Sequence, residues 1–115
     1  MLNHVALTVS DRERSASFYA EHFGLTERVH EDEHLLILGS ADGSLLALWE
    51  GEAVAAALPR TNHFGFQVET AQEVRAARER LREAGVTETE WQDEGFVRVQ
   101  VADPDEYRVE LFSFE

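Results

Sequence analysis

The feature that most constrains the fold of this chain is an internal repeat. Residues 4–9 (HVALTV) and 63–68 (HFGFQV) each begin with histidine and alternate polar with apolar residues, a pattern that predicts a half-buried β-strand. A helix-forming run follows each strand and ends at a glycine, Gly24 in the first copy and Gly85 in the second. The chain therefore contains one structural unit twice, with His63 opening the second copy.

Each copy carries the signals of one amphipathic helix. Ser10-x-x-Glu13 predicts a capping box at the start of the first helix, and Thr70-x-x-Glu73 predicts a weaker one at the start of the second. Gly24 is expected to end the first helix in a left-handed conformation. The predicted buried stripes, at helical spacing, are Ala16, Tyr19, Ala20 and Phe23 in the first helix and Val74, Ala77, Leu81 and Ala84 in the second.

Three strands are predicted after each helix, so each unit has the order βαβββ. They lie near residues 26–30, 34–38 and 44–49 in the first copy and near 88–92, 96–101 and 107–114 in the second. We expect a single α+β domain made of module one (about 1–50), a linker containing Pro59 (about 51–61) and module two (about 62–115). Because the helix of a module covers only one face of its sheet, the other face is expected to line a cavity or to pack on a second sheet.

The charge balance argues against several classes of partner. The chain has 10 basic residues, all arginine, against 23 acidic ones, and its formal net charge is −13. This charge opposes non-specific binding to nucleic acid or anionic lipid. The absence of lysine excludes Schiff-base chemistry and a Walker-type phosphate loop, since both need that residue.

The cysteine count and the hydropathy pattern limit the cellular setting. There is no cysteine, which excludes disulfides, thiolate metal ligands and a thiol nucleophile. No apolar run approaches membrane-spanning length, and no basic segment followed by a hydrophobic stretch opens the chain, so a signal peptide is not expected. These features fit a cytoplasmic location.

Three residues are candidate metal ligands. His4 and His63 occupy the same position in the two repeats, on the strand face that points away from the helices. Glu110 lies on the corresponding face of the last strand, between two apolar residues. Two imidazoles and one carboxylate form a facial triad that leaves positions open for water or substrate on Mn, Fe, Zn, Ni or Co. The alternative is that each is an ordinary surface residue, which is the interpretation we give to His22, His30 and His34, since they have no repeat partner.

Several other side chains share the same face and are candidate substrate contacts. Their alternative role is that of solvent-exposed sheet residues. The polar candidates are Thr8, Gln67, Arg98, Gln100 and Arg108, and the aromatic ones are Trp49 and Phe112. Two further aromatic residues, Trp91 and Phe96, could offer stacking surface to a bound drug or pack in the core.

The order of these motifs resembles that of the vicinal oxygen chelate superfamily, which contains glyoxalases, bleomycin resistance proteins and extradiol dioxygenases. The resemblance covers nearly the whole chain and implies paired βαβββ modules that form a cupped mixed sheet around a divalent metal, commonly at a homodimer interface. The segments that carry it are His4-Val5-Ala6-Leu7, Phe18-Tyr19 before Phe23-Gly24-Leu25, His63-Phe64-Gly65-Phe66, Asp103-Pro104-Asp105, and Arg108 to Phe112.

The sequence departs from its relatives at several positions. Ala47 stands in the first module where Glu110 stands in the second, so three protein ligands are implied in place of the four of glyoxalase I. Glu50 is expected to face the other way and not to substitute. Ala6 occupies the position at which fosfomycin-resistance transferases have threonine. Glu106 follows Asp103-Pro104-Asp105 where glycine would adopt the turn more easily.

Two functions are consistent with this sequence. The first is a small metal-dependent enzyme, lyase, isomerase or dioxygenase in type, that binds two oxygens of a small substrate, with His4, His63 and Glu110 as ligands. The second is a metal-free protein of the bleomycin-resistance type that sequesters a drug, cationic for a chain this acidic. We expect a homodimer in which His4 comes from the opposite subunit, the alternative being that the two modules of one chain pair with each other.

Overall fold

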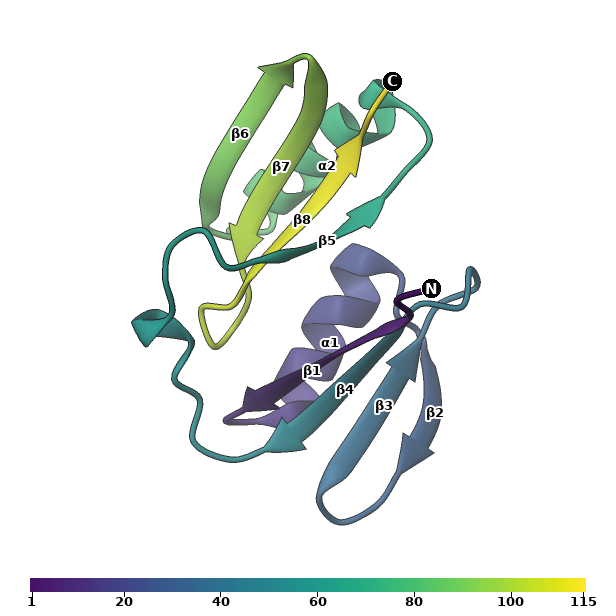
Figure 1. Cartoon of the computed structure of the whole chain (residues 1–115), viewed down its shortest axis with the longest axis vertical. Coiled ribbons are helices and arrows are strands. Elements are labelled where there is room, and N and C mark those ends of the chain that lie inside the picture. The colour runs from purple at the N-terminus through teal and green to yellow at the C-terminus, as the bar shows by residue number, and fades with distance from the viewer. The chain divides into compact units, whose positions relative to one another are not determined.

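The computed structural model describes all residues, 1–115, and the chain divides into two compact units, Met1–Ala55 and Ala56–Glu115 (Figure 1). The division falls inside the segment 51–61, where a linker was predicted, and a short 3-10 helix, Ala55–Ala57, spans it. Each unit has its own four-stranded sheet and its own α-helix.

The first unit has strand order β1-β4-β3-β2. Strand β1 runs parallel to β4, and the other neighbours are antiparallel. Its elements are β1 (His4–Val9), α1 (Arg12–Phe23), β2 (Glu27–Glu31), β3 (Leu35–Gly39) and β4 (Leu45–Glu50).

The second unit repeats this topology, with strand order β5-β8-β7-β6 and β5 parallel to β8. The α+β class and the tandem βαβββ modules are thereby confirmed. Its elements are β5 (Phe64–Gln67), α2 (Ala71–Glu83), β6 (Glu88–Glu94), β7 (Phe96–Ala102) and β8 (Arg108–Ser113).

Apolar side chains on one face of each sheet pack under the helix of the same unit. In the second unit Val99, Val101 and Val109 are at most 1% exposed, and burial of such a side chain stabilises the fold by about 1.5–3 kcal/mol. Alternation along the strands turns the remaining side chains, including Glu110, to the helix-free face. Polar side chains that could bind a ligand therefore lie on the helix-free face.

The start of α1 differs from the prediction. Asp11, not Ser10, is the N-cap: its carboxylate accepts a hydrogen bond of 3.1 Å from the backbone N–H of Arg14. The Ser10 hydroxyl instead accepts from the Arg14 guanidinium at 2.8 Å. Serine and aspartate cap helices about equally well, so adjacent candidates are not distinguished by preference alone. The Thr70 cap of α2 is confirmed, since its hydroxyl accepts from the backbone N–H of Glu73 at 3.2 Å.

The helix ends agree with the prediction except at Ala84. Gly24 ends α1 with a φ of 72°, in the left-handed region. Val74, Ala77 and Leu81 are buried along α2, but Ala84 lies past the last helical residue and is exposed. The helix stops one residue before the predicted stripe ends, so Ala84 does not join the core.

Candidate metal centre

Glu110 lies in the middle of the sheet of the second unit. It is on β8, opposite Gly65 of β5 on one side and Gln100 of β7 on the other. It is 5% exposed, whereas a carboxylate is almost never fully buried without a partner. Its position on the helix-free face is as predicted, because its neighbours Val109 and Leu111 are buried under α2.

Gly65 provides the space that Glu110 occupies. A Cβ atom at position 65 would lie 2.5 Å from Cγ of Glu110 and 3.3 Å from its carboxyl carbon. Contacts that short require the Glu110 side chain or one of the two strands to shift, so glycine is the residue that lets the Glu110 side chain lie across β5. No pattern in the sequence indicates this role of Gly65.

His63, directly before β5, faces the Glu110 carboxylate. Its Nε2 atom is 3.1 Å from Oε1 of Glu110, and its Nδ1 atom is 2.8 Å from the backbone carbonyl of Thr61. A carbonyl only accepts, so Nδ1 carries the hydrogen. In a neutral ring, Nε2 then carries a lone pair, which points at an oxygen of a carboxylate. Because both atoms are acceptors, the contact is favourable only if a proton or a metal ion lies between them.

This arrangement fits a metal ion. Metal-binding histidines usually donate their second ring nitrogen to a carbonyl or carboxylate, which fixes the ring and exposes the other nitrogen as a ligand. His63 has that orientation, with Glu110 beside it as an oxygen ligand. Imidazole nitrogen with carboxylate oxygen suits Mn, Fe, Co, Ni or Zn.

Arg98 of β7 also contacts Glu110. Its Nη1 atom donates a 3.2 Å hydrogen bond to Oε1, the same oxygen that faces His63. The side chains of Arg98 and Glu110 are 21% and 7% exposed, so the pair is shielded from water. Arg98 was predicted as a substrate contact, and the structure pairs it with the candidate ligand.

The other polar candidates of the second unit have local surroundings of their own. Gln100 is 2% exposed, and its amide oxygen accepts a 2.9 Å hydrogen bond from the Thr89 hydroxyl. The Arg108 guanidinium donates to the backbone carbonyl of Arg60. Gln67 is exposed at the end of β5 and, with Glu69 and Glu73, lines an open hollow.

The aromatic candidates of the second unit separate onto two faces. Phe112 contacts Phe114 with ring centroids 5.3 Å apart, and Phe114 contacts Phe96 at 5.6 Å. Trp91 instead lies under the guanidinium of Arg78 from α2, with the carbon of that group 4.1 Å from the ring centroid. Trp91 is therefore on the helix side and is not available for stacking on a ligand at Glu110.

His4, the third candidate ligand, belongs to the first unit. It is exposed at the start of β1, and its Nδ1 atom contacts the side-chain oxygen of Asn3 at 3.0 Å. Thr8 and Trp49 are neighbours across β1 and β4, and Trp49 is 46% exposed. Within either unit, no three histidine or carboxylate side chains gather to hold a metal ion.

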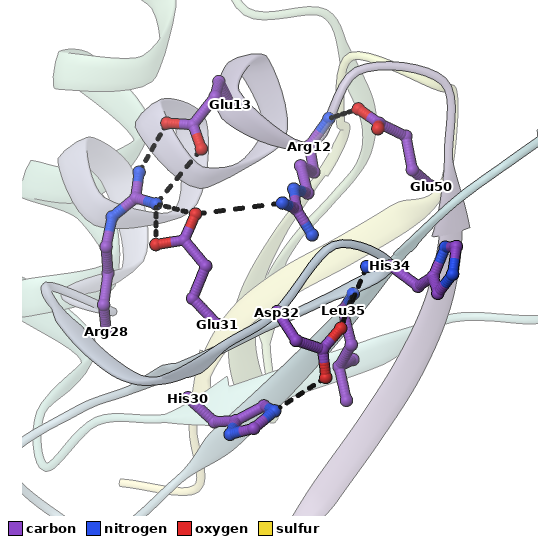
Figure 2. Close-up of polar contacts among 9 residues, drawn as sticks. All are labelled: Arg12, Glu13, Arg28, His30, Glu31, Asp32, His34, Leu35 and Glu50. Carbon is purple, nitrogen blue, oxygen red and sulfur yellow. Dashed lines mark hydrogen bonds and ion pairs between the residues drawn. The ribbon is translucent and has the colours of Figure 1, made fainter.

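His30, His34 and Glu50 of the first unit serve local structure (Figure 2). His22 was predicted to be a surface residue, but its side chain is only 10% exposed and its ring packs against Phe18 with centroids 5.1 Å apart. His30 contacts the carboxylate of Asp32 at 2.9 Å, and His34 is an exposed residue whose backbone N–H donates to the same carboxylate. Glu50 accepts a 3.3 Å hydrogen bond from the backbone N–H of Arg12, at the start of α1. Glu50 is thus directed to the helix, as expected of a residue that does not replace the missing ligand.

A comparison with protein-family models identifies the group to which the chain is related. Residues 1–111 match the model of the Glyoxalase/Bleomycin resistance protein/Dioxygenase superfamily. The chain belongs to this superfamily. A comparison with curated protein sequences gave no match. None of the helices of the chain is long and apolar enough to cross a membrane.

Solved structures of the superfamily share the whole fold. A possible glyoxalase from Bacillus cereus is 27% identical, with a TM-score of 0.81 and coverage of 96% of both chains. The fosfomycin resistance protein FosX from Listeria monocytogenes is 25% identical, with a TM-score of 0.79 and coverage of 98% of this chain and 92% of FosX. A FosX variant solved with Mn(II) and 1S,2S-dihydroxypropylphosphonic acid is 23% identical, with a TM-score of 0.80 and coverage of 96% and 87%.

Proposed function

We propose that this chain is a small enzyme that depends on a divalent metal and acts on a small substrate with two neighbouring oxygens. The observation that carries the proposal is the geometry of His63, whose Nδ1 is engaged by the Thr61 carbonyl while Nε2 faces Glu110 at 3.1 Å. A divalent metal ion between them would satisfy both a neutral imidazole nitrogen and a carboxylate oxygen.

The proposed ligands are His63 and Glu110 of the second unit together with His4 of the first. When bound, a divalent metal would act as a Lewis acid that stabilises negative charge on a substrate oxygen. Support comes from the Mn(II) complex of FosX, a relative in the same superfamily. The side chains Arg98, Gln100 and Phe112 surround Glu110 on the same face and are the proposed walls of the substrate site.

The oxygen-chelating step can be tested with acetohydroxamate, a small bidentate oxygen ligand. Protein loaded with Mn²⁺ should bind this probe, and the binding should change the electron paramagnetic resonance spectrum of the metal. Metal-free protein and the Glu110→Ala variant should show neither effect. Binding of Mn²⁺ without any response to acetohydroxamate would contradict the proposed substrate class.

We further propose a homodimer in which His4 of the partner subunit completes the site formed by His63 and Glu110. Two identical sites related by a two-fold axis would result. The test mixes His4→Ala chains with Glu110→Ala chains, neither of which can form a complete site alone. In the heterodimer one site regains all three ligands, so metal binding should recover to half of the wild-type amount. Verified heterodimers without recovery would exclude ligation across subunits.

A second candidate function, metal-free binding of a drug, is favoured by the aromatic cluster of the second unit. Phe96, Phe112 and Phe114 lie next to one another, and Phe114 is 69% exposed at the end of the chain. Rings in such a cluster offer stacking surface, and a net charge of −13 attracts a cation. Tight binding of bleomycin by chelator-treated protein, lost in a Phe112→Ala variant, would decide for this function.

A further inference from the structure

Glu110 has two neighbours that bear on its ability to hold a metal. His63 is the proposed second ligand, whereas Arg98 brings a permanent positive charge to the same carboxylate oxygen at 3.2 Å. A guanidinium cannot coordinate a metal, since it has donors and no acceptor. A metal ion held by His63 and Glu110 would be coordinated at Oε1, the oxygen that faces His63 and to which Arg98 already donates.

We propose that Arg98 is an internal counter-ion that competes with the metal for Glu110 and thereby sets the metal affinity of the site. The inference rests on the proposed function, because it assumes that Glu110 is a ligand. In the metal-free state Arg98 neutralises a carboxylate that is only 7% exposed at its side chain. A carboxylate left alone at that depth is destabilising, so Arg98 keeps the empty site folded.

Metal binding then requires an exchange of cations at one oxygen. The Arg98 hydrogen bond to Oε1 must lengthen or break before this oxygen can coordinate a metal ion. The nearby guanidinium also repels a divalent cation. Since the loss of one charge-assisted hydrogen bond changes an equilibrium about tenfold to a hundredfold, the metal affinity of the wild-type protein should be lower by that factor than that of a protein without Arg98.

A purely structural role of Arg98 predicts the opposite sign. If Arg98 only held Glu110 in the conformation that ligates, its removal would disorder the carboxylate and weaken metal binding. If Arg98 competes, its removal strengthens metal binding while the metal-free protein becomes less stable. Metal affinity and metal-free stability must therefore be measured together on the same variants.

The experiment compares the wild-type protein with Arg98→Gln, which keeps a hydrogen-bond donor near Glu110 and removes the charge. The matched control is Arg75→Gln, which removes an arginine of the same unit whose guanidinium pairs with Asp93 at 2.9 Å. Chelator-treated proteins are titrated with Mn²⁺ alone, followed by electron paramagnetic resonance, and their thermal unfolding midpoints are measured with and without the metal.

Arg98→Gln should bind Mn²⁺ about tenfold to a hundredfold more tightly than the wild type, should unfold at a lower temperature without metal, and should gain more stability from Mn²⁺. Arg75→Gln should leave the affinity within about threefold of the wild type. Unchanged or weaker binding by Arg98→Gln, with wild-type binding intact, would overturn the competition and leave the proposed function standing. Absence of Mn²⁺ binding in every protein would instead overturn both.

Discussion

Nε2 of His63 lies 3.1 Å from Oε1 of Glu110, while Nδ1 of the same ring lies 2.8 Å from the backbone carbonyl of Thr61. Glu110 is fixed in the central part of β8, and His63 leads directly into β5, its parallel neighbour. The pairing of these two strands therefore sets the distance between the two proposed ligands.

Substitution of Gly65 by alanine should damage the site. The new Cβ would lie 2.5 Å from Cγ of Glu110, so the carboxylate must move. We expect a loss of about 1–3 kcal/mol in the free energy of unfolding. The affinity for Mn²⁺ should fall at least about tenfold, because ligands work only within about 0.5 Å of their productive positions.

Gly39→Ala is the matched control for this substitution. Its Cβ would meet Cγ2 of Val29 at 2.8 Å, a similar collision in a strand of the first unit, with no candidate ligand beside it. That variant should lose stability and keep its Mn²⁺ affinity. Equal Mn²⁺ affinities for Gly65→Ala and the wild type would show that the position of Glu110 does not depend on Gly65.

Substitution of Glu106 by glycine should stabilise the protein. Glu106 has a φ of 73° and is the one non-glycine residue of the chain with a positive φ. A left-handed conformation costs a residue with a Cβ about 1–2 kcal/mol. Glycine avoids this cost, but it loses more conformational entropy on folding, which offsets part of the gain. The expected gain is up to about 1 kcal/mol in the free energy of unfolding, measured by urea denaturation. Asp105→Gly, one residue earlier and without a positive φ, should lower the free energy of unfolding. A lower free energy of unfolding for Glu106→Gly than for Asp105→Gly would refute backbone strain at Glu106.

Asp32 should make the stability of the protein sensitive to acid. Its pKa is lowered from 3.8 to about 2 by the His30 side chain, with further hydrogen bonds from the backbone N–H groups of His34 and Leu35 (Figure 2). A lowered pKa in the folded state means that the contribution to stability is complete above pH 3.8 and is lost as the pH falls towards 2.

Asp32→Asn removes this dependence. The difference in unfolding midpoint between the wild type and Asp32→Asn should be constant from pH 6 to about 4 and should shrink as the pH falls to about 2. Glu33→Gln, at the neighbouring exposed position, serves as the control for the loss of one negative charge. A difference in unfolding midpoint that stays constant down to pH 2 would contradict the claim that the hydrogen bonds of Asp32 cause the loss of stability in acid.

The sequence was sufficient to predict the repeated fold because strand and helix periodicities occur twice in the same order. The face of Glu110 followed from alternation along a strand, because successive side chains point to opposite faces of the sheet. His63 was predicted to be the first residue of a strand, whereas β5 begins one residue later, at Phe64. The ends of the helices were harder to predict. The sequence predicted Ser10 as the N-cap of α1, whereas the structure has Asp11, because both residue types are good caps.

The contacts of the candidate site could not be predicted from the sequence in the same way. The pairing of Arg98 with Glu110 depends on the register between β7 and β8, in which Glu110 lies opposite Gln100 and next to Arg98 only diagonally. The need for glycine at position 65 depends on the bend of the Glu110 side chain across β5. The contact of His63 with the Thr61 carbonyl involves a backbone group, for which side-chain patterns carry no signal.

The most direct test of the proposed metal centre is a Mn²⁺ titration of chelator-treated protein, followed by electron paramagnetic resonance. Wild-type protein and the control His34→Ala, which removes an exposed histidine of the first unit, should bind one Mn²⁺ per chain with the same affinity. His63→Ala should bind about a hundredfold more weakly, because it loses a ligand and not only the group that orients one. Absence of saturable binding by the wild type, or equal binding by His63→Ala, would contradict the metal centre.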